Sequence, residues 1–218
     1  MDDTFLQSLQ SRRDLEIIVG SLEPQSFYVQ QHLFESTTGC SIEAFGTGAK
    51  LEPGVLRFPD NDLISLQLLL RWMYHRVVPS GAFDQEVDIS SAMRTWGLGE
   101  RLDVPDFQNQ IMLCILRWLN EYSIDPELIK NVVRSSHINS PMRTLMVIET
   151  AWQIQNHNFE PEVLEELDGH GFLLQVMRVM RDGFECSPDY GVSRERIDYA
   201  IANKYMLRGG LLGQGFSQ

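Results

Sequence analysis

The spacing of apolar residues changes along the chain, and this change constrains the fold more than any other feature of the sequence. In residues 14–20, DLEIIVG, apolar residues alternate with others, which is typical of a strand with one buried face. Short apolar runs at 27–29 and 55–58 predict two further strands, and the turn-rich residues between the first two runs predict a β-hairpin. A short helix is expected over residues 30–36. Beyond residue 60 the apolar residues recur at helical spacing, so the sequence predicts an α+β fold in which a small sheet of about three strands is followed by helices.

The first long helix is expected to begin after a capping residue among Asp60, Asn61 and Asp62, whose side chains accept hydrogen bonds from backbone N–H groups at a helix start. This helix is apolar on most of its sides, which indicates a central position in the fold. Its predicted buried stripe is Leu66, Leu69, Leu70, Met73 and Val77, with Leu68 and Trp72 elsewhere around the helix.

The next two helices are predicted to form an αα-hairpin. Pro105 stands where the second of them can begin without losing a needed N–H group. Gly97 and Gly99 come before it, and because glycine costs about 1 kcal/mol inside a helix, we expect Gly99 to allow a close approach between the helices. The predicted buried residues are Ile89, Ala92, Met93 and Trp96 in the first helix and Phe107, Ile111, Cys114, Ile115 and Trp118 in the second.

The remaining sequence is predicted to be mainly helical. Helices are expected over residues 126–133, 141–155, 162–167 and 172–180, and proline near the start supports the first two. Residues 193–206 form a weaker helix candidate, and the residues after them are expected to fray. The predicted buried residues of the helix at 172–180 are Leu173, Val176, Met177 and Met180.

Composition excludes several classes of function. The 18 Lys and Arg residues against 30 Asp and Glu residues leave a formal net charge of −12, which opposes direct nucleic-acid binding because phosphates need a basic surface. Cys40, Cys114 and Cys186 form no closely spaced pair, as is typical of reduced thiols in an intracellular protein. The first residues lack the regions of a signal peptide, and the longest apolar run is too short for a bilayer. We expect a protein of the cytoplasm, the nucleus or both, neither secreted nor bound to a membrane.

Motifs that carry chemistry are weak in this sequence. Gly97-Leu98-Gly99 contains glycines that let a backbone approach a phosphate, but a phosphate loop needs a preceding strand and a third glycine or a Lys-Ser/Thr pair. A helix precedes the glycines here, so a joint between helices is the better interpretation. The histidines have no metal-binding spacing and are expected on the surface; they are His32, His75, His137, His157 and His170.

Paired carboxylates are equally uninformative, because Glu165-Glu166 and Asp60/Asp62 are expected on solvated helix faces or caps. We therefore predict no catalytic, cofactor-binding or metal-ligating residues, no cofactor and no small-molecule substrate. One alternative stays open: a small α-rich enzyme whose site is assembled from scattered residues such as Cys40, His75 and Glu100.

Several segments occur in an order that is typical of one protein family. They are the strand that begins with Arg13-Asp14-Leu15, FYV at 27–29, LLLRWMY at 68–74, and the stretch at 96–105 that ends in Val104-Pro105. In this order they resemble the BTB/POZ domain, an interaction fold in which a short sheet is capped by helices. DPELIKNVV and SPMRTLMV, within residues 125–147, are similar to the helical extension of short BTB proteins from filamentous fungi.

The resemblance implies a flexible segment at 1–12, a BTB/POZ-like domain at 13–120, a helical extension at 121–185 and a weakly ordered segment at 186–218. It implies a non-enzymatic protein–protein interaction function, either as an adaptor that bridges to a cullin-3 ubiquitin ligase or through self-association. An alternative within the family is a transcription-associated regulator without its own DNA-binding module. Both a monomer and a dimer are compatible with the sequence, because the segment at 1–12 is short for the helix that many family dimers exchange.

The sequence departs from the family pattern after the second strand. BTB domains that recruit corepressors use an aspartate and a basic residue as a charged pocket, and Asp14 matches the aspartate whereas Gln31 replaces the basic residue. Gln30-Gln31 likewise replaces the family's His-Lys, and Thr37-Thr38 and Ser41 replace its Arg-Ser and Phe. Corepressor binding by that route is therefore not expected.

Overall fold

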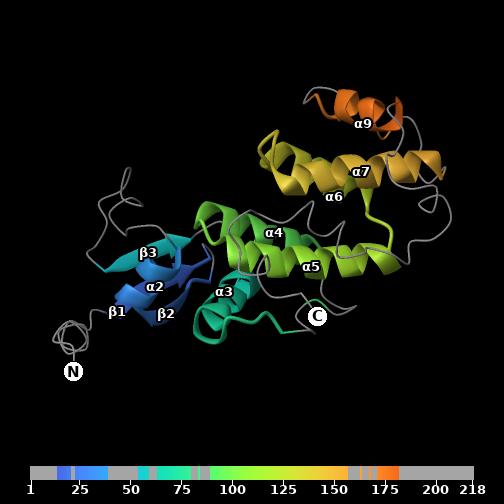
Figure 1. The fold of residues 1–218 in the computed structure, drawn as a ribbon. Helices are drawn as coiled ribbons and strands as arrows, with labels where there is room; N and C mark the ends of the chain where they lie inside the picture. The colour runs from blue at the N-terminus through green and yellow to red at the C-terminus, as the bar shows by residue number, and fades with distance from the viewer. Residues whose placement is uncertain are drawn as a thin grey trace, which may run out of the picture. The chain divides into compact units, whose positions relative to one another are not determined.

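A computed structural model of the chain shows an α+β fold with a three-stranded mixed sheet and, among the described residues, seven helices (Figure 1). The chain forms two compact units, Met1–Gln110 and Ile111–Gln218. The coarse fold class predicted from the sequence is confirmed. The structure describes residues 14–20, 23–38, 54–58, 63–79, 83, 89–156, 163, 167 and 171–181.

The sheet of the first unit has the strand order β2-β1-β3. β1 (Asp14–Val19) pairs antiparallel with β2 (Gln25–Gln30), which confirms the predicted hairpin, and it pairs parallel with β3 (Val55–Phe58). The alternation seen in the sequence is the alternation of burial, since Leu15 and Ile17 are fully buried and Val19 is 2% exposed. Side chains on one face of β1 thus form the sheet's contribution to the core.

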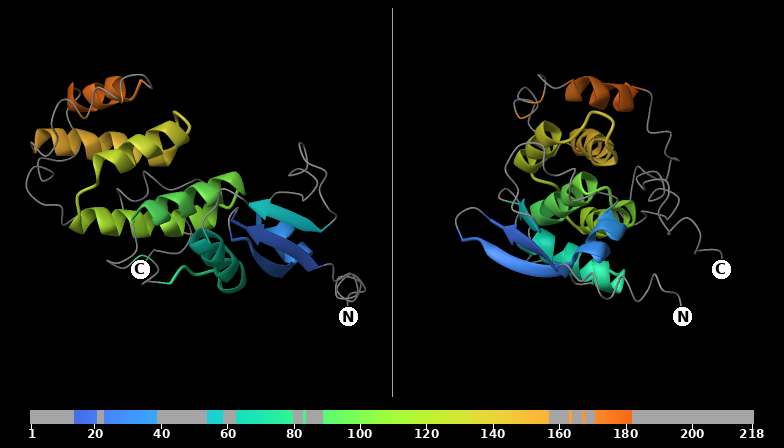
Figure 2. Two further views of the ribbon diagram at one scale, coloured as in Figure 1. Left: turned by 180° about the vertical axis from the view of Figure 1, so that it is seen from behind. Right: turned by 90° about the vertical axis from the view of Figure 1, so that its left-hand side faces the viewer.

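Two helices of the first unit follow the strands. α2 (Gln31–Thr38) continues directly from β2 and lies beside the sheet in the views of Figure 1 and Figure 2, with Phe34 fully buried. α3 (Leu63–His75) buries Leu66, Leu69 and Met73, as its spacing predicts. It also buries Trp72, which lies outside the predicted stripe, whereas Leu70 of that stripe is only partly buried. The capping residues proposed for its start lie outside the described residues.

The expected burial of Val77 on α3 is wrong. The helix ends at His75, and Arg76 adopts a left-handed backbone conformation with a φ of 57°. Val77 is therefore outside the helix and 60% exposed. Helical spacing after Met73 placed Val77 on the buried stripe, whereas the helix ends before it and the turn at Arg76 directs it to solvent.

α4 (Ile89–Arg101) and α5 (Pro105–Glu121) form the predicted αα-hairpin, with α5 starting at the predicted proline. The buried residues expected in α4 are all buried, and so are Phe107, Ile111 and Ile115 in α5. Cys114 and Trp118 are only partly buried, because they lie at the margin of the buried stripe. Across α3 and α4 the hydroxyl oxygens of Ser65 and Thr95 are 2.9 Å apart, and both residues are fully buried.

The joint of the hairpin confirms the role expected for Gly99. The carbonyl of Gly99 accepts a hydrogen bond of 2.9 Å from the Val104 N–H, which closes the turn. A Cβ added at Gly99 would lie 2.6 Å from Cγ of Gln108 and 3.2 Å from Cδ1 of Phe107, both closer than ordinary contact. A Cβ at Gly97 would have no neighbour within 4 Å. The two glycines therefore differ in function although they share one helix.

The second unit contains three helices beyond α5: α6 (Pro126–Ser135), α7 (Pro141–Gln155) and α9 (Phe172–Arg181). Both prolines lie at the starts of their helices, as predicted, and each helix is capped by the preceding side chain. The Asp125 carboxylate accepts a hydrogen bond of 2.7 Å from the Glu127 N–H, and the Ser140 hydroxyl accepts one of 3.1 Å from the Arg143 N–H. Among the described helices, none is long and apolar enough to cross a membrane.

The buried stripe predicted for α9 is partly wrong. Phe172 and Val176 are the buried residues of this helix, whereas Met177 is 65% exposed. Leu173 and Met180 are partly buried. Because apolar residues occur all around α9, its sequence did not distinguish which side of the helix faces α7. The helices expected at 162–167 and 193–206 lie outside the described residues except for Val163 and Leu167, and so do the segments 1–12 and 186–218.

Arg143 joins the helices of the second unit. Its side chain is buried, with a residue exposure of 4%, and its Nη1 donates to the carbonyl of Val133 at the end of α6 over 2.9 Å. Its Nε donates to Oε1 of Gln175 in α9 over 3.3 Å, and its guanidinium lies 5.8 Å from the ring centre of Phe172. Burial lowers the pKa of Arg143, but an arginine stays charged at neutral pH, so these contacts stabilise a buried cation.

Substituting each of the two glycines of α4 by valine separates their roles. We expect Gly99→Val to lower the free energy of unfolding by about 1 to 3 kcal/mol, because the new side chain must displace the buried Phe107 and Gln108. Gly97→Val makes the same change in helix propensity without the clash and should change stability by about 0.5 kcal/mol or less. Urea denaturation of both variants measures the difference, and equal midpoints would show that Gly99 is not sterically constrained.

Candidate functional site

One side of α3 carries large apolar residues that are not buried in the fold. At about 100° per residue, Ile64, Leu68, Arg71 and Tyr74 fall within an arc of roughly 120°, opposite the buried side of the helix. Ile64 is 43% exposed and Tyr74 is 55% exposed, whereas Leu68 is partly buried. Together with Val77 just after the helix, these four residues are called the α3 face.

The segment that follows α3 is held by the side chain of Gln110. Its Oε1 accepts a hydrogen bond of 2.8 Å from the Val78 N–H, and its Nε2 donates one of 3.0 Å to the Arg76 carbonyl. Val78 is 8% exposed, whereas Val77 between the two anchored residues is 60% exposed. The amide of Gln110 thus fixes the backbone on both sides of Val77 and presents that side chain to solvent.

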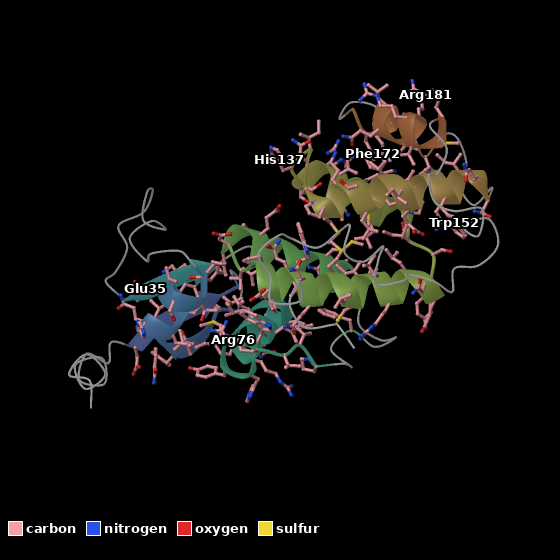
Figure 3. The ribbon with its side chains drawn as sticks, in the orientation of Figure 1. Glu35, Arg76, His137, Trp152, Phe172 and Arg181 are labelled. Atoms are coloured by element: carbon pink, nitrogen blue, oxygen red, sulfur yellow. The ribbon has the colours of Figure 1, made fainter. Side chains whose placement is uncertain are left out.

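Arg76 ties the end of α3 to its surroundings. The guanidinium lies 4.9 Å from the ring centre of Trp72, and its Nη2 donates over 3.4 Å to the hydroxyl of Thr37 in α2. The Arg76 N–H also donates to the Trp72 carbonyl over 2.7 Å. Trp72 in turn stacks on Phe107, with 5.5 Å between the ring centres (Figure 3 labels Arg76 at the end of α3). The α3 face therefore stands on a rigid base of aromatic and hydrogen-bonded contacts.

The chemistry of the α3 face suits contact with another protein. Apolar and aromatic side chains beside an arginine are the residue types that form the energetic centres of protein interfaces. Adjacent exposed apolar residues that are held in place also lose less conformational entropy on binding than mobile ones. The side chains of Ile64, Leu68 and Val77 contain no acid, base or nucleophile, so this part of the face supports binding and not proton transfer.

Asp14 and Gln31, which the BTB/POZ resemblance would align with the charged pocket of corepressor-binding domains, lie at the start of β1 and of α2. Asp14 is exposed at the start of β1, and Gln31 donates from Nε2 to Oε1 of Glu35 over 3.1 Å. Glu35 is labelled in Figure 3. Nearby, the Tyr28 hydroxyl donates to Glu16 over 3.3 Å, and the charge of Glu16 raises the pKa of Tyr28. Gln31 is thus a neutral side chain that binds an acid, which differs from the basic residue of such pockets.

Of the residues that an enzyme site would require, some are exposed on the surface and others lie outside the described part of the chain. His32, His75 and His137 are exposed, as expected for surface histidines. Glu100 is exposed on α4 and Cys40 lies outside the described residues, so a site that joins Cys40 to His75 and Glu100 stays untested. The carboxylate pairs at 165–166 and 60–62 also lie outside. Among the described residues there is no group of three potential metal ligands.

Cys114 is the cysteine that the structure describes, and it is partly buried in α5. Burial raises the pKa of the Cys114 thiol, and the charge of Arg117 lowers it by a smaller amount. The thiol is therefore protonated at neutral pH, and a protonated thiol is a poor nucleophile.

The α3 face and its support were not identified from the sequence. The sequence predicted α3 as a central helix, which is correct for Trp72 and its neighbours, but apolar residues on its outer side gave no sign of their exposure. Gln110 offered a weak signal, since a polar residue next to the apolar stripe of α5 often hydrogen-bonds to a neighbouring backbone. Its partners at 76 and 78 are distant in sequence and could not be inferred.

Comparison with protein-family models finds no matching family, and comparison with curated proteins finds no match.

The clamp made by Gln110 is tested by Gln110→Ala. We expect the Val78 amide hydrogen to exchange with solvent at least about ten times faster, because its acceptor is removed and the segment opens locally. The free energy of unfolding should fall by about 1 kcal/mol, since a partly buried N–H group loses its acceptor, whereas the exposed carbonyl of Arg76 can bind water instead. Gln67→Ala, on the outer side of α3, is the control and should leave exchange at Val78 unchanged. Unaltered exchange in Gln110→Ala would show that the segment holds its position without the clamp.

Proposed function

We propose that the chain is a non-enzymatic protein-interaction module of the BTB/POZ type that binds a partner protein through the α3 face. The observation that carries this proposal is the exposure of Ile64 and Tyr74 on α3, and of Val77 in the segment just after it that Gln110 holds. Contiguous apolar residues that remain exposed on a well-packed support are a mark of an interaction site.

The order of elements supports the BTB/POZ assignment. A β-hairpin, a short helix, a third strand parallel to the first, a core helix and an αα-hairpin follow one another in the first unit. This is the order that the resemblance over residues 13–120 implies. α6 and α7 stand where the resemblance at 125–147 implies a helical extension, with Pro126 and Pro141 at the helix starts.

Two partners follow from the resemblance: a second copy of the chain and a cullin-3 ubiquitin ligase. Either interaction needs an apolar centre that is desolvated on binding, and the α3 face provides one. The net charge of −12 favours partner surfaces that are basic or of mixed charge and makes association dependent on salt. In this proposal the protein acts in the cytoplasm or the nucleus, as an adaptor or as a self-associating unit.

The experiment uses the full chain in two assays: light scattering after size-exclusion chromatography, and capture of purified cullin-3. Tyr74→Glu replaces an exposed aromatic side chain of the α3 face by a charge and should weaken whichever interaction the wild type shows by about ten-fold or more, equivalent to about 1.4 kcal/mol. Ile138→Glu is the matched control, because Ile138 is 51% exposed against 55% for Tyr74 and belongs to the second unit. Ile138→Glu should bind within two-fold of the wild type.

The outcomes distinguish an error in the proposed binding surface from an error in the proposed function. A wild-type chain that stays monomeric at all concentrations and captures no cullin-3 contradicts the proposed function. If the wild type binds and Tyr74→Glu binds equally well, then the interaction uses a surface other than the α3 face. Thermal melting of Tyr74→Glu near the wild-type midpoint confirms that any loss of binding is not a loss of folding.

A further inference from the structure

β2 lies at one edge of the sheet, and among the described residues no strand pairs with its outer side (Figure 1). The bonds of β1 show which backbone groups of β2 face outward. The Glu16 N–H donates to the Gly54 carbonyl over 2.8 Å, and the Gly20 N–H donates to the Phe58 carbonyl over 3.1 Å. Backbone groups of successive residues point to opposite sides of a strand. The even-numbered residues of β1 therefore bond toward β3, and the odd-numbered ones bond toward β2.

The register of the hairpin carries this alternation into β2. Ile17 lies opposite Phe27, so these two residues exchange backbone hydrogen bonds. Ser26 and Tyr28, on either side of Phe27, therefore direct their N–H and C=O groups away from β1. Among the described residues, no backbone group bonds to these outward groups. Ser26 is exposed and Tyr28 is 68% exposed. The outward N–H and C=O groups of these two residues are called the β2 edge.

The composition of β2 does not prevent pairing with another chain. Exposed edge strands commonly carry lysine, proline or a bulge that blocks an additional strand. β2, with the sequence QSFYVQ, contains no charged residue and no proline. Its central residues, Phe27, Tyr28 and Val29, are of types that favour β-structure. A row of unpaired donors and acceptors on such a strand fits one kind of occupant, an extended segment that adds a strand to the sheet.

The side chains beside the β2 edge determine which segment fits. Residues directly opposite each other in neighbouring strands share a face of the sheet, so Tyr28 lies on the same face as Glu16. The Tyr28 hydroxyl donates to the Glu16 carboxylate over 3.3 Å. Asp14 is exposed opposite Gln30 on this face, and Glu23 is exposed just before β2. β1 and β2 contain no lysine, arginine or histidine. The hairpin thus presents an aromatic ring and carboxylates without a cation of its own.

A strand added at the β2 edge places every second side chain on this acidic face. The residue opposite Tyr28 would have its Cβ about 4.5 to 5.5 Å from the Cβ of Tyr28. A lysine or arginine at that position packs against the Tyr28 ring and is attracted by Glu16. The residues between such cations lie on the other face, beside the half-buried Phe27, where an apolar side chain is favoured. The net charge of −12 attracts a basic segment and repels a second copy of the chain.

We propose that the β2 edge binds an extended segment of another protein in which basic and apolar residues alternate. The backbone of the segment bonds to Ser26 and Tyr28 and adds a strand to the sheet beside β2. Its cations lie beside Tyr28 and Glu16, and its apolar residues lie beside Phe27. This surface is separate from the α3 face, and its function does not depend on the BTB/POZ assignment.

The charge preference is tested with short peptides and the full chain. The probe is a nine-residue peptide that alternates lysine and valine and carries a fluorophore, and binding is followed by fluorescence anisotropy. A second peptide has glutamate in place of every lysine. We expect the lysine peptide to bind at least about ten-fold more tightly than the glutamate peptide, and its affinity to fall as salt screens the carboxylates.

The backbone pairing is tested with two N-methylated forms of the lysine peptide. One form carries methyl groups on the backbone nitrogens of the lysines, and the other carries them on those of the valines. Alternate N–H groups of a strand point to opposite sides, so only one of these two sets can face β2. One form should therefore bind at least about ten-fold more weakly than the other, although both have the same charge and side chains.

Substitutions locate the binding site. Ser26→Pro removes an outward N–H, which an edge strand tolerates, and should weaken the lysine peptide by about ten-fold or more, whereas Ser26→Ala should bind within two-fold of the wild type. Glu16→Gln should weaken binding by about three-fold or more and reduce its salt dependence. Glu121→Gln, at an exposed acid of α5, is the matched control and should bind within two-fold. Tyr74→Glu should also bind within two-fold, which separates this proposal from the proposed function.

Amide hydrogen exchange of the wild type locates the site without any substitution. The N–H groups of Ser26 and Tyr28 gain acceptors in the complex, so their exchange should slow by at least about ten-fold when the lysine peptide saturates the chain. The Val78 N–H already donates to Gln110 and should keep its exchange rate. This measurement decides the proposal even if Ser26→Pro lowers the melting temperature.

Several outcomes would overturn the proposal. Absence of binding by the lysine peptide, or equal affinity for the lysine and glutamate peptides, would show that the edge does not select a basic segment. Equal binding of the two N-methylated forms, or unchanged exchange at Ser26 and Tyr28, would show that no strand is added. Equal losses in Glu16→Gln and Glu121→Gln would assign binding to the overall charge. If the wild type is a dimer that Ser26→Pro dissociates, then a second copy occupies the β2 edge instead.

Discussion

The first unit depends on the close approach that Gly99 permits between α4 and the start of α5. Because Gly99 has no side chain, Phe107 and Gln108 lie against the helix at distances that a Cβ would prevent. The first turns of α5 then bring Phe107 to the ring of Trp72, 5.5 Å between centres, and Gln110 to the backbone after α3. One residue without a side chain therefore positions both supports of the α3 face, although it lies on neither α3 nor the face itself.

A buried cation has a comparable role in the second unit. Burying a guanidinium costs free energy unless its N–H groups find acceptors, and Arg143 finds them at Val133 and Gln175. If α9 were rotated, the Arg143 Nε would lose the hydrogen bond that it donates to Gln175, so this contact favours one orientation of α9 over others. The same cation lies against Phe172 and thereby decides which side of α9 is left to solvent. The orientation of α9 in this unit is therefore set by a polar contact as well as by apolar burial.

Local sequence signals were enough to predict where most helices and strands begin. The features that were not predicted depend on contacts between residues far apart in the sequence. Pro105 and Pro141 start helices as predicted, because the requirement they satisfy lies within one helical turn. The Gln110 clamp joins residues more than thirty positions apart, so no local pattern encodes it. Val77 and Met177 were expected to be buried because they are apolar and follow helical spacing, yet both are exposed. The error at Val77 falls on the α3 face, since a binding surface is where apolar residues keep no partner within their own chain.

The net charge makes self-association through the α3 face depend on ionic strength. Two copies of a chain with a net charge of −12 repel each other, so self-association through the α3 face must overcome a repulsion that salt screens over about 8 Å at physiological ionic strength. The acidic surface thus discourages non-specific contact between copies.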